Sequence, residues 1–315
     1  MNEMLIKIIY AIIEMFCMFG VGALAMRLKF IEEKDLSKLG QLIIDIMFPM
    51  LAFSSITSTF DPSKLNELWM LPALGFGLML FGGVTGFVFR YGMRNKSKDR
   101  IITFHHFCAI NNYVFLPLII LQSLWGMKYV ALLLVMNIGS TLGFWTIGVG
   151  ILSGGCIKKT IKNIFSVNLF AVLLALAFCF LKIPVPTLAA NVFAKIGGIA
   201  VPLMLVVIGA AIWNSAHHLL KNKWDIIYLA SIRLVILPLM LAAILNLLPL
   251  PPEVFRVAFI VSLMPVSASA VVFMRRFGGD PDLAAQAAVI TTLLSVLTIP
   301  LMTYLFRGVL FPVSA

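Results

Sequence analysis

The chain has 315 residues, of which 61% are hydrophobic and only 12% are charged, and its mean hydropathy is +1.05. A soluble domain needs more polar surface than this, so we exclude a water-soluble globular protein and expect an all-α polytopic membrane protein. The formal net charge of +11 does not indicate nucleic acid as a partner, because the basic residues are spread over short loops.

Apolar stretches long enough to cross a bilayer, about 20 residues each, recur from end to end and predict ten transmembrane helices. Their predicted ranges are 4–26, 36–58, 68–91, 101–124, 129–153, 164–181, 190–214, 224–247, 254–277 and 283–306. The segments after the odd-numbered helices carry sixteen of the 24 Lys and Arg residues. We therefore expect these segments to face the cytoplasm, with both termini outside, in an inner (cytoplasmic) membrane.

Two of the predicted helices contain breaks. In the fourth, Asn111 and Asn112 precede Pro117, and in the ninth, Pro265 is followed by Ser267 and Ser269. Proline lacks a backbone donor and clashes with the carbonyl four residues back, so both helices should be interrupted. A membrane tolerates such backbone only where it faces protein or a watery cavity, and matching breaks in two halves of a chain indicate a transporter.

The ten helices divide into five and five, and an odd-numbered unit that is repeated once must be inverted in the membrane. Landmarks recur in step: Lys38-Leu39-Gly40 precedes Pro49 in the second helix, and Lys195-Ile196-Gly197 precedes Pro202 in the seventh. We predict two inverted repeats, residues 1–153 and 154–315, with Pro49 and Pro202 as hinges. Where two antiparallel broken helices cross, their half-helix N-termini favour an anion.

Charged groups within a span are costly and usually functional. Glu14 lies in the first helix, Asp45 in the second and Arg233 in the eighth, five residues before Pro238. Either carboxylate could carry a proton, and Asp45 could instead bind a cation. A Na⁺ site would need a cage of oxygen ligands, which Asn111, Asn112, Gln286 and exposed carbonyls could supply. Arg233 could form a structural pair with Glu14 or Asp45, or its planar fork could hold a substrate carboxylate. His105 and His106 are expected to anchor the chain at the cytoplasmic interface.

Motifs of nucleophile, zinc and nucleotide chemistry do not occur in the sequence: there is no GxSxG, HExxH or P-loop. The four cysteines form no CxxC pair and have no metal-ligand spacing. We therefore expect no enzyme activity, no catalytic residues, no metal site and no cofactor. Uphill transport would have to draw on an H⁺ or Na⁺ gradient or on the membrane potential.

A segment near the C-terminal end resembles a known family. The run Phe277-Gly278-Gly279-Asp280-Pro281, followed by Thr291-Thr292 and Pro300-Leu301, is similar to the ninth-to-tenth helix signature of the auxin efflux carrier family of bacterial and plant transporters. Pro202-Leu203-Met204 in the seventh helix and Arg233 with Pro238 in the eighth are similar to that family too.

This resemblance implies a crossover of broken helices four and nine, a scaffold domain of helices one, two, six and seven, and a transport domain made of the rest. It implies elevator-like movement, homodimers through the scaffold, and organic anions such as auxin, malate or malonate as substrates. The family's crossover asparagine maps onto Asn111 or Asn112, most simply Asn112. The usual glycines after it are replaced by Tyr113, Val114 and Phe115, and its counterpart in helix nine is a serine, Ser267 or Ser269.

The sequence therefore predicts a secondary active transporter of a small organic anion that works by elevator-type alternating access. The alternative is a passive channel or a membrane sensor on the same fold. The expected partners are the anion, membrane lipid and a second copy of the chain. The expected substrate-binding residues are Asn111, Asn112, Tyr113, Pro117, Pro265, Ser267 and Ser269.

Overall fold

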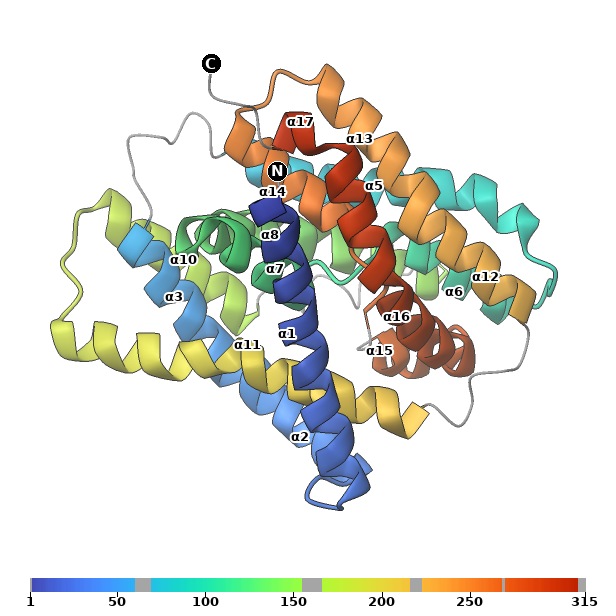
Figure 1. Ribbon diagram of the computed structural model, residues 1–315, viewed down its shortest axis with the longest axis horizontal. Helices are drawn as coiled ribbons and strands as arrows, with labels where there is room; N and C mark the ends of the chain where they lie inside the picture. Colours follow the sequence, from blue (N-terminus) through green and yellow to red (C-terminus); the bar gives the residue numbers. More distant parts are fainter. Residues whose placement is uncertain (1, 60–68, 155–165, 216–222, 268–269, 311–315) are drawn as a thin grey trace.

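A computed structural model describes residues 2–59, 69–154, 166–215, 223–267 and 270–310, and every regular element in these ranges is a helix (Figure 1). In the first half of the chain the elements are α1 (Asn2–Arg27), α2 (Glu33–Leu42), η1 (Ile43–Met47), α3 (Phe48–Thr59), α5 (Met70–Phe89), η3 (Arg90–Gly92), α6 (Lys98–Ala109), α7 (Phe115–Trp125), α8 (Met127–Gly143), η4 (Phe144–Gly148) and α9 (Val149–Leu152). In the second half they are α10 (Val167–Phe180), α11 (Thr187–Ser215), α12 (Lys223–Ser231), η8 (Ile232–Ile236), α13 (Leu237–Leu247), α14 (Pro252–Ser262), α15 (Ala270–Phe277), α16 (Pro281–Leu305) and α17 (Arg307–Leu310).

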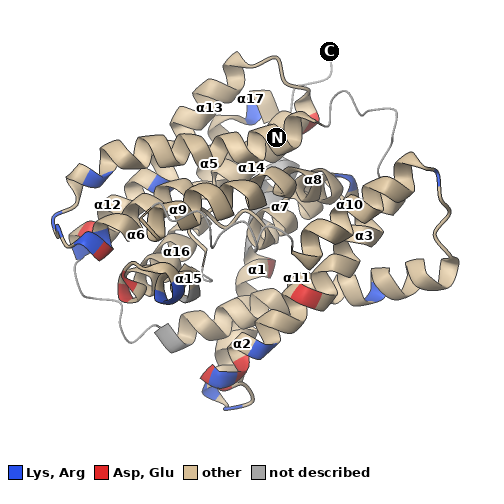
Figure 2. Cartoon of the chain, turned by 180° about the vertical axis from the view of Figure 1, so that it is seen from behind, with Lys and Arg blue, Asp and Glu red and all other residues tan. Residues whose placement is uncertain are grey.

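Six continuous helical runs in the described residues are long and apolar enough to cross a membrane. They are Glu33–Thr59, Met70–Gly92, Met127–Leu152, Thr187–Trp213, Lys223–Leu247 and Pro281–Leu305. Each coincides with one predicted span. The other four predicted spans correspond to α1, to the short apolar helix α10 and to two pairs of half-helices, α6 with α7 and α14 with α15. Charged residues gather mainly at the helix ends and loops, as Figure 2 shows, which suits helices surrounded by lipid.

Three of the long helices contain a π-helical turn, and proline explains two of them. Pro49 follows η1, and Pro238 follows η8. A wider turn before a proline moves the carbonyl four residues back away from the ring, so the helix continues without a break. The predicted hinge at Pro49 is therefore a π-helical turn, whereas Pro202 lies inside α11, which continues past it.

The helices form two groups that meet along α7, α8 and α16. In the first group, α1 packs on α11, and α3 packs on both α10 and α11. In the second, α5 packs on α6 and α8, and α16 packs on α12 and α15. Contacts of α1 and α11 with α7 and α16, and of α3 with α8, join the groups.

Glycines allow the closest helix crossings. A Cβ atom on Gly22 of α1 would strike the backbone of Val206 in α11, and one on Gly209 of α11 would strike the backbone of Phe19 in α1. Because lipid provides little hydrophobic drive for helix association, such close backbone packing is a main source of stability between membrane helices. The α1–α11 crossing is therefore fixed by one small residue on each side.

Candidate functional site

The first break separates α6 from α7. The last helical residue of α6 is Ala109, and the next residue, Ile110, has extended backbone angles. Pro117 is the third residue of α7, a position whose N–H has no partner within the helix, so the proline starts the second half-helix at little cost. The side-chain oxygen of Asn112 accepts a hydrogen bond from the backbone N–H of Phe115, the first residue of α7, at 3.3 Å.

The second break separates α14 from α15. Helix α14 ends at Ser262, and a buried, non-helical segment with Pro265 at its centre follows. Thr291 of α16 reaches this segment, because its hydroxyl accepts a hydrogen bond from the N–H of Val266 at 3.3 Å. The same hydroxyl also donates to the carbonyl of Ala287 within its own helix.

The two breaks touch each other. The backbone N–H of Asn112 donates to the carbonyl oxygen of Pro265 at 2.8 Å, and the side-chain amide of Asn111 donates to the carbonyl of Val261. Both asparagines are 6% exposed. Backbone groups that would be unpaired in lipid are thus satisfied by the opposite break. We call these touching segments, residues 110–114 and 263–267, the crossover.

Arg233 lies beside the crossover, with 3% of its surface exposed. Its guanidinium donates to three backbone carbonyls, those of Met264, Cys108 and Ser262, at 3.0, 3.3 and 3.1 Å. The ion pairs among the described residues do not join Arg233 to Glu14 or Asp45. The structural carboxylate pair considered for Arg233 is therefore replaced by bonds to the ends of helices.

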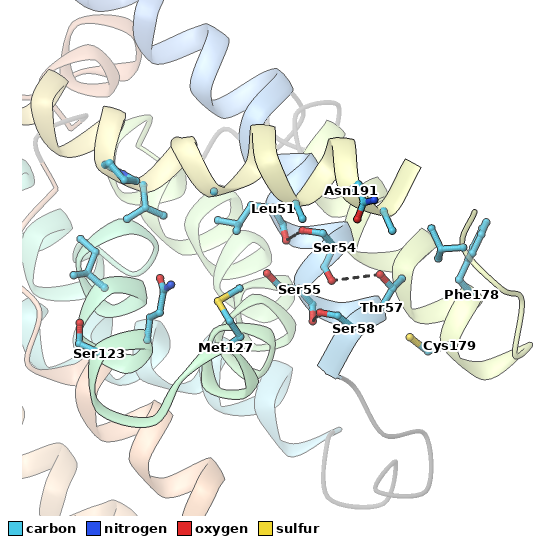
Figure 3. Close-up of a pocket in the computed structure, with 18 of the residues that line it drawn as sticks. Leu51, Ser54, Ser55, Thr57, Ser58, Ser123, Met127, Phe178, Cys179 and Asn191 are labelled. Atoms are coloured by element: carbon cyan, nitrogen blue, oxygen red, sulfur yellow. Dashed lines mark hydrogen bonds between the residues drawn. The ribbon is translucent and has the colours of Figure 1, made fainter. Parts of the chain in front are cut away.

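A large cavity of about 1160 Å³ lies apart from these contacts, between α3, α10 and α11 on one side and α7 with the start of α8 on the other (Figure 3). Its polar lining residues are Glu14, Ser54, Ser55, Thr57, Ser58, Gln122, Ser123, Lys182 and Asn191. Figure 3 shows hydroxyls of α3 on one wall and Ser123 and Met127 on the opposite side. Helix α7 connects the cavity to the crossover, because it begins at the break and lines the cavity through Ile119, Gln122 and Ser123.

A model of a family described as membrane transport protein matches the chain twice, over residues 7–155 and again over residues 155–303. The chain belongs to this family. The match confirms the resemblance to the auxin efflux carrier family that the ninth-to-tenth helix segment indicated. An "Uncharacterized transporter" from Methanothermobacter thermautotrophicus is 26% identical over 274 residues, which cover 85% of this chain and 88% of the relative. The protein is therefore a membrane transporter of the auxin efflux carrier family.

The transporter brings most of the predicted substrate-binding residues together at the crossover. Asn111, Asn112 and Pro265 make the contacts that define it. Tyr113 is half-buried and lies against Phe144, with ring centroids 6.4 Å apart. Ser267, also half-buried, accepts a bond from the N–H of Ala270 through its carbonyl. Ser269 lies outside the described residues.

The three charged positions predicted within spans lie in different places. Glu14 of α1 lines the large cavity, Asp45 of η1 is exposed on the outer surface of the helices, and Arg233 is buried at the crossover. The interfacial role expected for His106 is wrong. Its side chain is fully buried, with Nδ1 2.9 Å from the carbonyl oxygen of Gly148. No group of three His, Cys, Asp or Glu side chains suited to a metal ion occurs in the described part of the chain.

Sequence reasoning did not assign the cavity-lining hydroxyls of α3 to a site. Ser54, Thr57 and Ser58 donate to backbone carbonyls of their own helix, as Ser and Thr in membrane helices usually do. The signal was the density of hydroxyls: five of the six residues from Ser54 to Thr59 are Ser or Thr, in a helix whose other residues are apolar. Only the tertiary structure shows that these positions face an open cavity.

Proposed function

We propose that this transporter is a secondary carrier of a small organic anion, a carboxylate such as malate, malonate or an auxin-like acid, and that it works by elevator-type alternating access. One observation carries the proposal: the two interrupted helices meet, with the N–H of Asn112 bonded to the carbonyl of Pro265. Each break is followed directly by the N-terminal end of a half-helix, α7 or α15. Such ends carry partial positive charge and unpaired N–H groups, which suit a carboxylate.

Residues on both strands of the crossover form the proposed binding site. Asn111 and Asn112 contribute amides, and Ser267 and Ser269 contribute hydroxyls. Tyr113 adds an aromatic surface for the apolar part of the anion. Pro265 lies in non-helical backbone and Pro117 lies in the first turn of α7, so the polar backbone groups between the half-helices can face the site instead of the next turn.

The two groups of helices support a division into a scaffold and a moving part, within ten spans arranged as two inverted repeats. We assign α1, α2, α3, α10 and α11 to the scaffold and the remaining helices, with the crossover, to the transport domain. The cavity lies between the two, where α3, α7 and α10 end and α11 begins. In the orientation predicted from basic residues this is the outer side, which supports an outward-facing state as part of the proposal.

Coupling, if transport is uphill, is assigned to Glu14. This carboxylate lines the cavity, whereas Asp45 does not. A proton or a Na⁺ ion on Glu14 would neutralise a charge on the scaffold wall that otherwise repels the anion. The alternative is transport driven by the membrane potential alone. Flux measured with and without H⁺ and Na⁺ gradients distinguishes coupled transport from this alternative.

Flux in proteoliposomes tests the proposal. We expect saturable uptake of at least one radiolabelled carboxylate from a panel of mono- and dicarboxylates, and loss of uptake in Asn112→Ala and Pro265→Ala. Asn246→Ala is the matched control, since Asn246 is exposed at the end of α13. Wild-type flux in both crossover variants would refute the carrier site. Conductance far above carrier rates would indicate a channel instead, and binding without flux a sensor.

A further inference from the structure

Arg233 makes contacts that neither a substrate clamp nor an ion pair would require. Two of its three bonded carbonyls lie at the C-terminal ends of the half-helices that precede the breaks, and the third lies just inside the second break. Cys108 is the next-to-last residue of α6, Ser262 is the last residue of α14, and Met264 follows two residues later. One side chain therefore reaches the ends of both half-helices.

The position suits a guanidinium for two physical reasons. The last four carbonyls of a helix have no partner within it, and inside a membrane there is no bulk water to supply one. The C-terminal end also carries partial negative charge, which attracts a cation. A planar fork with donors in fixed directions can serve several carbonyls on two segments at once, whereas the ammonium of lysine is a single compact charge.

Neighbouring contacts complete the same arrangement. The side-chain amide of Asn111 donates to the carbonyl of Val261, and the backbone N–H of Asn112 donates to the carbonyl of Pro265. Further carbonyls at and after the end of α14 are therefore also bonded to the first break. A Cβ atom on Gly82 of α5 would strike the carbonyl oxygen of Cys108, the same atom that Arg233 binds. The position of that carbonyl thus depends on the close packing of α5 as well as on the guanidinium.

We propose that Arg233 is a positioning residue that holds the two breaks in register and sets the affinity for the anion through the backbone around Asn112 and Pro265, without touching the anion. This inference rests on the proposed function for its consequence in transport. That Arg233 joins the ends of α6 and α14 can be tested without any substrate. The charge alone does not fulfil the role, because the geometry of the fork determines which carbonyls are joined.

Two substitutions separate geometry from charge. Arg233→Lys keeps the positive charge and loses the fork, and Arg233→Gln loses both. For a carboxylate that the wild type transports, we expect KM to rise about tenfold or more in both variants, a change equivalent to roughly 1.4 kcal/mol of affinity per factor of ten. A KM in Arg233→Lys equal to that of the wild type, with a raised KM in Arg233→Gln, would show that charge suffices and would overturn the proposal.

A second variant disturbs the same carbonyl without altering Arg233. Gly82→Ala should displace the Cys108 carbonyl that the guanidinium binds and raise KM in the same direction as Arg233→Lys. Gly77→Ala on the same helix is the matched control, because a Cβ atom there meets nothing within 4 Å. Equal KM values for Gly82→Ala and Gly77→Ala would contradict the proposal, and this comparison remains available if the Arg233 variants do not fold.

The thiol of Cys108 supplies a readout that does not depend on transport. It is fully buried beside the bonded carbonyl. In a chain whose other three cysteines are replaced by alanine, the thiol should react slowly with N-ethylmaleimide. We expect about tenfold faster labelling in Arg233→Lys and Gly82→Ala, and the rate of the parent protein in Gly77→Ala.

The two readouts distinguish failure of this inference from failure of the proposed function. If the wild type transports none of the carboxylates but labelling rises as expected, the proposed substrate class is wrong and the positioning role stands. If wild-type flux is present and neither KM nor labelling changes in the folded fraction of Arg233→Lys, the positioning role is refuted and the carrier function stands.

Discussion

Arg100, near the start of α6, forms an ion network between three helix N-termini. Its guanidinium lies 3.5 Å from Asp225 at the start of α12 and 3.1 Å from Asp280, which caps α16. The side chains of Arg100 and Asp225 are only 8% and 2% exposed. We expect Arg100→Met, which keeps the length of the side chain and removes its charge, to destabilise the folded transporter strongly.

The magnitude follows from which charge is left behind. Asp225 would keep its bond from the backbone N–H of Arg94 but lose its buried cation. Removing one partner of a buried ion pair typically costs about 3–5 kcal/mol. Asp280 is 20% exposed and keeps its capping bond to Leu283, so it should add little. By contrast, Lys128 and Glu253 are 45% and 32% exposed, and breaking their pair should cost about 0–1 kcal/mol.

Unfolding free energies in mixed micelles, measured with increasing amounts of a denaturing detergent, test this expectation. The variants are Arg100→Met, Asp225→Asn, the double variant and the control Lys128→Met. We expect the double variant to be more stable than Arg100→Met, because it leaves no uncompensated buried charge, and the double-mutant cycle gives the coupling directly. A cost for Arg100→Met no larger than that for Lys128→Met, with no recovery in the double variant, would refute the reasoning.

Three further predictions concern packing, coupling and access. Gly209→Leu should separate α1 from α11 and lower the free energy of unfolding by about 1–3 kcal/mol or more, whereas Gly20→Leu, at a position with nothing within 4 Å of an added Cβ, should change it little in the same assay. If a proton couples transport, Glu14→Gln should abolish the dependence of flux on a pH gradient and Asp45→Asn should retain it; the reverse pattern would assign coupling to Asp45. Cys179, which lines the cavity, should react with an impermeant maleimide added to the outside of intact cells, and a transported carboxylate should slow that reaction. Labelling only from the cytoplasmic side would reverse the predicted orientation.

The breaks near Asn112 and at Pro265 were predicted from the local chemistry of proline. Proline disfavours a continuous helix wherever it occurs, and its position alone predicts an interruption. The same rule was less informative for Pro49 and Pro238, where a π-helical turn absorbs the missing bond and the helix continues. A proline can interrupt a helix, widen one turn or, as at Pro202 in α11, leave the helix continuous, so its position alone does not decide between these outcomes.

The amino-acid sequence by itself determined that this protein is helical, membrane-spanning and a member of a transporter family, because hydropathy, prolines and family motifs are properties of the chain. Tertiary structure alone decided what its polar side chains contact. Arg233 was predicted to meet a carboxylate, yet it meets three backbone carbonyls, each more than 25 residues away from it in sequence. The hydroxyls of α3 face a cavity only because α7, α10 and α11 leave space opposite them. Hydrogen-bond partners across helices depend on how the helices cross, and that depends on packing over the whole molecule rather than on any local segment.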